Sequence, residues 1–185
     1  MKVGRKISSF LLYKLWGWKV EVSFAPRDKC ILCVAPHTSN IDFFVAHLYY
    51  ASLGRKAAFL MKKEWFVWPL SSIFYQMGGI PVDRSQHGNL TDYLAEKAKS
   101  GDRFELAITP EGTRSVCHQW KRGFYYIALK AGIPIQLYGL DYANKRIVGN
   151  MELMPTGDVD ADMLKIQTYF KDFKGRHPER FSAGV

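Results

Sequence analysis

Hydrophobic and polar positions follow a strand-like spacing in some segments and a helix-like spacing in others. The change from one spacing to the other falls near glycine and proline residues. Short apolar or alternating runs indicate strands, which are predicted over residues 18–24, 29–35, 56–62, 79–82, 103–109, 133–140 and 145–153. Longer runs with apolar residues three or four apart indicate helices, which are predicted over residues 3–16, 40–54, 64–78, 88–101, 120–132 and 158–174. Because strands alternate with helices, the sequence predicts the α/β class: a single domain whose mostly parallel or mixed central sheet is flanked by helices.

Single residues mark several boundaries of these elements. The second helix is predicted to begin with Asn40 as its N-cap and to stop at Gly54. Pro69 is expected to break or bend the third helix. The run "KCILCVA" is continuously apolar, which is typical of a central strand, whereas "KRIVGNMEL" is expected to add edge strands.

The N-terminal segment, residues 1–17, is predicted to be an amphipathic helix that precedes a domain over residues 18–185. Its apolar residues recur at helical spacing and are Val3, Ile7, Phe10, Leu11 and Leu15; its charged residues are Lys2, Arg5, Lys6 and Lys14. Two interpretations stay open, and both can hold. The helix packs on the domain, or it lies on a membrane with Trp16 and Trp18 near the lipid headgroups.

The charge of the chain narrows the class of partner. The formal net charge is +9 and the isoelectric point is near 9.5, which favours nucleic acid, an anionic membrane surface or a phosphorylated substrate. No nucleic-acid-binding motif is present, so no nucleic acid is expected as a partner. No apolar run approaches the roughly 18–20 residues of a transmembrane helix. Lys14 interrupts the apolar N-terminal run and no small-residue cleavage site follows it, which argues against a signal peptide.

The three cysteines are an odd number, which argues against a disulfide framework and favours a reducing compartment. Cys30 and Cys33 lie three apart on a predicted strand, so their side chains face opposite ways and are poorly placed to chelate a metal. A zinc site completed by Cys117 and His118 is therefore not expected.

Polar turns follow three of the predicted strands. "PHTSN" follows "KCILCVA", "DRSQH" follows "GIPV", and "TPEGTRS" follows "RFELAIT". Ligand sites of α/β proteins lie at the carboxyl ends of the strands, so these turns are expected to converge on one edge of the sheet.

His37 and Asp42 lie five positions apart, between a buried strand and the first turn of a helix. A carboxylate there can accept a hydrogen bond from one imidazole nitrogen and leave the other free as a base. The alternative is a loop histidine beside an aspartate that complements the helix dipole. The same spacing recurs at His87 and Asp92, but that pair opens a polar helix, and a neutral surface role is expected for it.

The turn "TPEGTRS" and the nearby Arg84 offer groups suited to an anion. Gly112 allows a tight turn, Thr113 offers a hydroxyl, and Arg114 carries a planar fork that matches phosphate. Glu111 can accept a hydroxyl or fix an arginine. The alternative is a surface turn in which the glutamate and arginine pair with each other.

The segment "KKEWFVWPLSSIFYQMGG" has apolar residues around nearly its whole circumference, so it needs cover on several sides. We expect most of its large side chains in the core, with a pocket for an acyl chain or contact with a bilayer as alternatives.

Four stretches, in this order, resemble the motifs of the glycerolipid acyltransferases typified by lysophosphatidic acid acyltransferase. "HTSNID" is similar to the first motif, His-x-x-x-x-Asp, and "GIPVDR" to the second, with Pro81 where many members carry a bulkier apolar residue. "TPEGTRS" is similar to the third motif, with Thr109 in place of a phenylalanine, and "GIPIQL" to the fourth. The resemblance runs from about Val34 to Leu140, and the short chain looks most like compact bacterial members.

The resemblance implies an O-acyltransferase of phospholipid biosynthesis. Acyl-CoA or acyl-carrier protein would deliver a fatty acyl group to the hydroxyl of a lysophospholipid-type acceptor, with lysophosphatidic acid as the default. It implies that His37 is the general base, that Asp42 orients it, and that the acceptor hydroxyl attacks the thioester without a protein nucleophile. The residues that it assigns to the phosphate or polar head of the acceptor, or to donor phosphates, are Arg84, Glu111, Gly112, Thr113 and Arg114.

The resemblance implies no metal and no cofactor apart from the acyl donor. It suggests a cytoplasmic protein that is peripheral on the inner face of the cell membrane, with an anionic membrane surface as a partner. Two other classes stay open on the residues alone. One is an esterase or phosphoesterase in which the same His37–Asp42 pair activates water, and the other is a basic binding module without chemistry.

Overall fold

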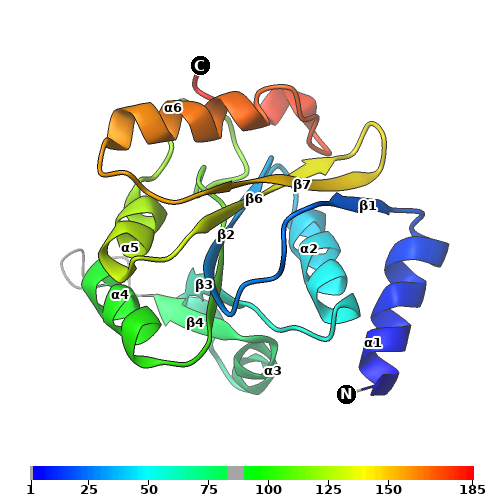
Figure 1. Ribbon diagram of the computed structural model, residues 1–185. Coiled ribbons are helices and arrows are strands. Elements are labelled where there is room, and N and C mark those ends of the chain that lie inside the picture. Colours follow the sequence, from blue (N-terminus) through cyan, green and yellow to red (C-terminus); the bar gives the residue numbers. More distant parts are fainter. Residues whose placement is uncertain (1, 83–89) are drawn as a thin grey trace.

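A single seven-stranded sheet forms the centre of the protein (Figure 1). The computed structural model describes residues 2–82 and 90–185, and within them the strand order is β1-β7-β6-β2-β5-β3-β4. The strands are β1 Lys19–Val22, β2 Lys29–Ala35, β3 Ala58–Lys62, β4 Gly79–Val82, β5 Phe104–Ile108, β6 Ile135–Asp141 and β7 Arg146–Leu153. All neighbouring strands are parallel except β6 and β7. The predicted α/β fold with a mostly parallel sheet is confirmed.

Helices cover both faces of the sheet. The α-helices are α1 Lys2–Ser9, α2 Asn40–Ser52, α3 Leu70–Met77, α4 Leu90–Ser100, α5 Gly123–Ala131 and α6 Val159–Phe170. Three short helices join them: the π-helix η1 Phe10–Leu15 and the 3-10 helices η2 Lys63–Trp65 and η3 Pro178–Arg180. Figure 1 shows α1 outside α2, with α4 and α5 on the opposite side of the sheet.

Two hydrophobic clusters form the core, one on each face of the sheet. Leu12, Leu32 and Val45 belong to the cluster beneath η1 and α2, whereas Leu94 and Tyr125 belong to the cluster beneath α4, α5 and α6. The central strand β2 contributes to both clusters because alternate side chains of a strand face opposite ways. Burial on both faces explains why its sequence is continuously apolar.

Cys30 and Cys33 illustrate this division. Both are fully buried, and they lie in different clusters on opposite faces of the sheet, as the strand assignment predicted. Burial raises the pKa of the Cys33 thiol well above its usual value, so it stays protonated and unreactive.

Helix α2 begins differently from the prediction, because Ser39 rather than Asn40 is the N-cap. The side-chain oxygen of Ser39 accepts a hydrogen bond from the Ile41 N–H at 3.2 Å, and the Asp42 carboxylate accepts one from the Ser39 N–H at 2.8 Å. This reciprocal capping box fixes Asp42 in the first turn. Asn40 is left exposed, where its side-chain oxygen accepts a hydrogen bond from Arg114.

The last predicted strand is not an edge strand. β7 lies inside the sheet, parallel to β1 on one side and antiparallel to β6 on the other. The edge is β1, which pairs Lys19 with Arg146 across most of the chain length. The hydrophobic pattern of a short segment carries no information on which distant strand it pairs with. The sequence therefore could not distinguish an edge strand from an internal strand here.

The predicted core position of the segment after β3 is wrong for most of its large side chains. A 3-10 turn is followed by a break at Pro69 and then by α3, as the proline suggested. Six large side chains of this segment are exposed: Trp65, Val67, Trp68, Leu70, Ile73 and Tyr75. The segment follows β3, which together with β4 ends the sheet on that side, away from the two main helix layers.

The N-terminal helix packs on the domain, which was one of its two expected arrangements, and it also exposes apolar side chains. Leu12 is fully buried, the Arg5 guanidinium donates to the Ser52 carbonyl at 2.9 Å, and the Tyr13 and Ser52 hydroxyls lie 3.1 Å apart. The helix therefore packs on α2. Four apolar side chains nevertheless face solvent: Val3, Ile7, Phe10 and Leu15. Among the described helices, none has the length and apolar character that a membrane span requires.

Candidate active site

The turn between β2 and α2 brings His37 and Asp42 together. Their Nδ1 and Oδ2 atoms are 3.3 Å apart, and the His37 side chain is 20% exposed whereas that of Asp42 is 2% exposed. The imidazole of His37 is thus partly exposed to solvent, whereas the carboxylate of Asp42 is enclosed. Because Nδ1 faces Asp42, Nε2 lies on the opposite side of the ring, where a substrate hydroxyl can approach it.

The Asp42 carboxylate is held by donors on both of its oxygens. Oδ2 accepts the backbone N–H groups of Thr38 at 2.7 Å and Ser39 at 2.8 Å, and Oδ1 accepts the Tyr142 hydroxyl at 2.5 Å. Burial alone would raise the pKa of Asp42, but its interactions with His37, Tyr142, Ser39 and Thr38 hold that pKa below its usual value. Asp42 is therefore ionised at neutral pH and can stabilise an imidazolium.

The Nδ1 and Oδ2 atoms are close, but their contact is not a well-directed hydrogen bond. The two atoms are close enough to pair, yet within the described residues Nδ1 has no partner that meets hydrogen-bond geometry. Catalytic hydrogen bonds are often loose in the absence of substrate and tighten in the reacting complex. The contact between His37 and Asp42 is loose in the same way in this structure.

Glu111 lies behind this turn and is almost completely buried. Its Oε1 accepts the His37 backbone N–H at 2.8 Å, and within the described residues its Oε2 has no hydrogen-bond partner. Burial raises the pKa of Glu111 to about 7, against the opposing effect of the hydrogen bond from His37. Glu111 therefore fixes the backbone of His37 from inside the protein.

The rest of the third motif lies at the surface. Gly112 has a positive φ of 65°, which suits glycine, and Thr113 and Arg114 beside it are exposed. The Arg114 guanidinium donates to the side-chain oxygen of Asn40, at the outer start of α2. Arg114 thus contacts the start of α2, the helix that follows the His37 turn.

Arg84 and His87 lie outside the residues that the structure describes. Asp92, the partner proposed for His87, is exposed in the first turn of α4 and pairs with Lys130. A salt-bridged surface position agrees with the neutral role expected for that aspartate.

The C-terminal segment closes the other side of the turn, and sequence reasoning missed it. The His177 N–H donates to Thr38 Oγ1 at 3.1 Å. A Cβ added to Gly175 would lie 2.8 Å from the same Oγ1 and 3.0 Å from Pro36 Cβ, so the backbone here is in direct contact with the turn. Tyr142, which follows β6, was also missed. The sequence could have indicated Tyr142, because it follows a predicted strand. That strand, β6, is parallel to β2, and its carboxyl end reaches the same edge of the sheet.

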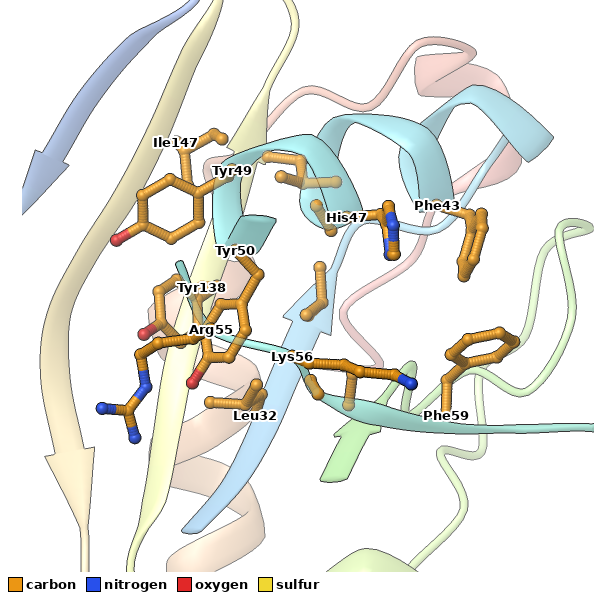
Figure 2. A pocket seen from close by; sticks show the side chains of 15 residues that line it. Leu32, Phe43, His47, Tyr49, Tyr50, Arg55, Lys56, Phe59, Tyr138 and Ile147 are labelled. Atoms are coloured by element: carbon orange, nitrogen blue, oxygen red, sulfur yellow. The ribbon is translucent and has the colours of Figure 1, made fainter. Parts of the chain in front are cut away.

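An apolar cavity of about 70 Å³, partly open to solvent, lies between α2 and the sheet (Figure 2). Val34, Phe43 and Phe59 line it, and two of these adjoin the His37–Asp42 turn in the sequence. In Figure 2, Phe43, His47 and Phe59 lie at one end of the cavity, and Tyr50, Arg55 and Tyr138 lie at the other. The cavity is thus lined largely by hydrocarbon and aromatic groups, together with the side chains of Arg55 and Lys56.

A family model described as Acyltransferase matches residues 19–137, which is more than half of the chain. The chain belongs to the Acyltransferase family. The match includes the whole turn of His37 and Asp42 and the turn of Glu111 and Arg114. It ends before Tyr142, so the contact of Tyr142 with Asp42 lies outside the matched residues.

The crystal structure of the 1-acyl-sn-glycerophosphate (LPA) acyltransferase PlsC from Thermotoga maritima is similar to this acyltransferase. The TM-score is 0.58 and the identity 21%, over 84% of this chain and 69% of that chain. At this identity the likeness establishes a common fold. No curated protein matches the chain.

Proposed function

We propose that this acyltransferase moves a fatty acyl group from acyl-CoA or acyl-carrier protein to the hydroxyl of a lysophospholipid-type acceptor, with lysophosphatidic acid as the first candidate. One observation carries the proposal: a reachable histidine, His37, is backed by a buried and ionised Asp42. Within the described residues neither nearby hydroxyl is hydrogen-bonded to the His37 ring: Thr38 Oγ1 accepts from the His177 N–H and Ser39 Oγ accepts from the Ile41 N–H.

The chemistry then needs no protein nucleophile. His37 Nε2 takes the proton of the acceptor hydroxyl while the hydroxyl oxygen attacks the thioester carbonyl. Asp42 stabilises the imidazolium that forms. The tetrahedral intermediate collapses with cleavage of the carbon–sulfur bond, and the imidazolium proton passes to the departing thiolate. Acyl ester and free thiol are the products, and neither a metal nor another cofactor takes part.

The exposed turn beside the base supports an acceptor that carries phosphate. Arg114 and Thr113 present a guanidinium and a hydroxyl close to the start of α2, and Gly112 allows the backbone to approach a ligand. We assign Arg84 the same role on its motif. The net charge of +9 favours both an anionic acceptor and the phosphates of an acyl donor.

The apolar lining of this cavity suits a segment of the acyl chain. Its lining by Val34, Phe43 and Phe59 places hydrocarbon surface next to the segment that bears the base. A thioester carbonyl held at the turn could extend its chain into this space, where burial of apolar area favours binding.

Exposed apolar surface supports a peripheral position on the inner face of the cell membrane. The N-terminal helix exposes Val3, Ile7 and Phe10 beside basic residues, and the segment after β3 exposes Trp65 and Trp68. Tryptophan favours the boundary between hydrocarbon and water, and basic residues favour anionic lipid.

The deciding experiment follows both products. The protein is incubated with an acyl thioester, with and without lysophosphatidic acid, while free thiol and acylated lipid are measured. Thiol release that depends on the acceptor, with an equal amount of new phospholipid, is expected. Release of thiol and free fatty acid at the same rate without acceptor would show a hydrolase instead.

A further inference from the structure

We propose that Tyr142 is a positioning residue of the reaction, whose hydroxyl holds the Asp42 carboxylate so that Oδ2 faces His37. This inference rests on the proposed function for its catalytic consequence. Its structural part, the hold on Asp42, stands on the geometry alone and can be tested separately.

The two oxygens of Asp42 have different partners, and together they set the orientation of the carboxylate. Thr38 and Ser39 donate their N–H groups to Oδ2, while the Tyr142 hydroxyl donates to Oδ1 at 2.5 Å. With both oxygens engaged, rotation of the carboxylate breaks at least one hydrogen bond to a charged group. The oxygen that faces His37 Nδ1 is thereby selected.

Tyr142 is itself held firmly by contacts from two other parts of the chain. Its ring packs edge-to-face against Trp18, with centroids 4.9 Å apart and planes at 87°. Its backbone N–H donates to the Lys174 carbonyl at 2.9 Å. Trp18 is buried, so the ring of Tyr142 rests on the core rather than on a mobile surface group. A rigid donor can define the position of its acceptor.

The hydroxyl has the right chemistry for this role. Burial, followed by the hydrogen bond to Asp42, raises the pKa of Tyr142, so the phenol stays protonated and remains a donor. The other ionisable groups that influence this pair are His37 and Glu111 on the Asp42 side and Arg176 on the Tyr142 side. Loss of the hydroxyl removes one of the interactions that keep the Asp42 pKa low.

The test is the substitution Tyr142→Phe, which keeps the ring on Trp18 and removes only the hydroxyl. We expect kcat for acyl transfer to fall about ten-fold, with the KM values of donor and acceptor unchanged, because the group acts through Asp42 and touches no substrate. Tyr169→Phe is the matched control. Its half-buried hydroxyl donates to the Val148 carbonyl at 3.3 Å, away from the site, so kcat should not change.

A second measurement separates this role from general stabilisation. Carbon-detected NMR of carboxyl-labelled protein follows the titration of Asp42, assigned with Asp42→Asn. We expect the Asp42 pKa to rise in Tyr142→Phe and to stay unchanged in Tyr169→Phe. An unchanged Asp42 pKa, or an unchanged kcat in a protein that does transfer acyl groups, overturns the proposal. If wild-type protein transfers no acyl group, the proposed function fails, and the titration still decides whether Tyr142 holds Asp42.

Discussion

At the scale of single residues, His37 differs from His118 in the groups that surround it. His118 also has a polar partner, since its Nδ1 lies 3.1 Å from the Ser182 hydroxyl, but it is exposed and has no carboxylate behind it. His37 has a buried carboxylate on one side of the ring and a glutamate that fixes its backbone. Of these two environments, that of His37 suits the general base that we propose.

His37→Ala should therefore lower the rate of acyl transfer by roughly 100- to 10,000-fold, the range expected for loss of a general base. His118→Ala should leave the rate within about two-fold, because it removes a surface contact with little effect on stability. Steady-state thiol release with saturating acceptor measures both. Equal losses in the two variants would contradict the assignment of the base.

The raised pKa of Glu111 predicts a dependence of stability on pH. The folded-state pKa is about 7 and the ordinary value 4.5, so between these pH values the folded state binds more protons than the unfolded state. The free energy of unfolding then falls as pH rises through that window, by at most about 3 kcal/mol from this group.

Glu111→Gln keeps an oxygen for the His37 N–H and abolishes the titration. We expect the variant to gain stability relative to wild type as the pH is raised from 5 to 8, with most of the change between pH 5 and 7. Urea unfolding at several pH values gives the comparison. If the free energy of unfolding depends on pH in the same way in both proteins, folding does not raise the pKa of Glu111.

At the scale of elements, the sequence predicted whether a segment forms a helix or a strand, but it did not predict which groups contact that element. The apolar run of β2 predicted a central strand, and Gly132 predicted the end of α5, where it adopts a positive φ of 66°. Both features arise within a few residues. The capping of α2 by Ser39 depends on Asp42 turning back to the Ser39 N–H, and the sequence offers Asn40 as an equally good cap.

The N-terminal helix yields a prediction of its own because it has two separable surfaces. In Ile7→Ser/Phe10→Ser, two exposed side chains are changed, so binding to anionic vesicles should weaken about ten-fold or more while stability stays nearly constant. Vesicle co-sedimentation at low salt is the measurement.

Leu12→Ala is the matched control, because Leu12 is fully buried against the domain. It should lower the free energy of unfolding by about 2–5 kcal/mol and leave the vesicle affinity of the folded protein unchanged. If the double serine variant binds vesicles as wild type does, the exposed face of this helix is not the lipid contact.

At the scale of the whole molecule, the site depends on segments that are a hundred or more residues apart. Tyr142 reaches Asp42 from the end of β6, and His177 and Gly175 reach Thr38 from the C-terminal segment. The His37 turn is therefore enclosed by contacts that belong to the tertiary structure and lie outside the matched family region.

Gly175→Ala tests that enclosure. The added Cβ would meet Thr38 Oγ1 at 2.8 Å and Pro36 Cβ at 3.0 Å, so the turn or the C-terminal segment must shift. We expect a loss of about 1–3 kcal/mol in the free energy of unfolding and a lower kcat, because overpacking strains the turn that carries His37.

Gly123→Ala is the comparison, since a Cβ at Gly123 would have no atom within 4 Å. That variant should unfold at the same temperature as wild type or slightly higher and keep its kcat. Differential scanning calorimetry and the thiol assay together measure the effect. If the Gly175→Ala protein has wild-type stability and rate, the C-terminal segment shifts to accommodate the added methyl group without loss of either.

The sequence by itself determined the class of fold, the strand that bears the site, and the pairing of His37 with Asp42, because these rest on local periodicity and on motifs within a few residues. It did not determine that Ser39 caps α2, that β7 is internal, that the tryptophans after β3 are exposed, or that Tyr142 holds the carboxylate. Each of these depends on which distant segment packs against the residue. That choice is made by burial and hydrogen bonding across the folded chain, so only the tertiary structure decided it.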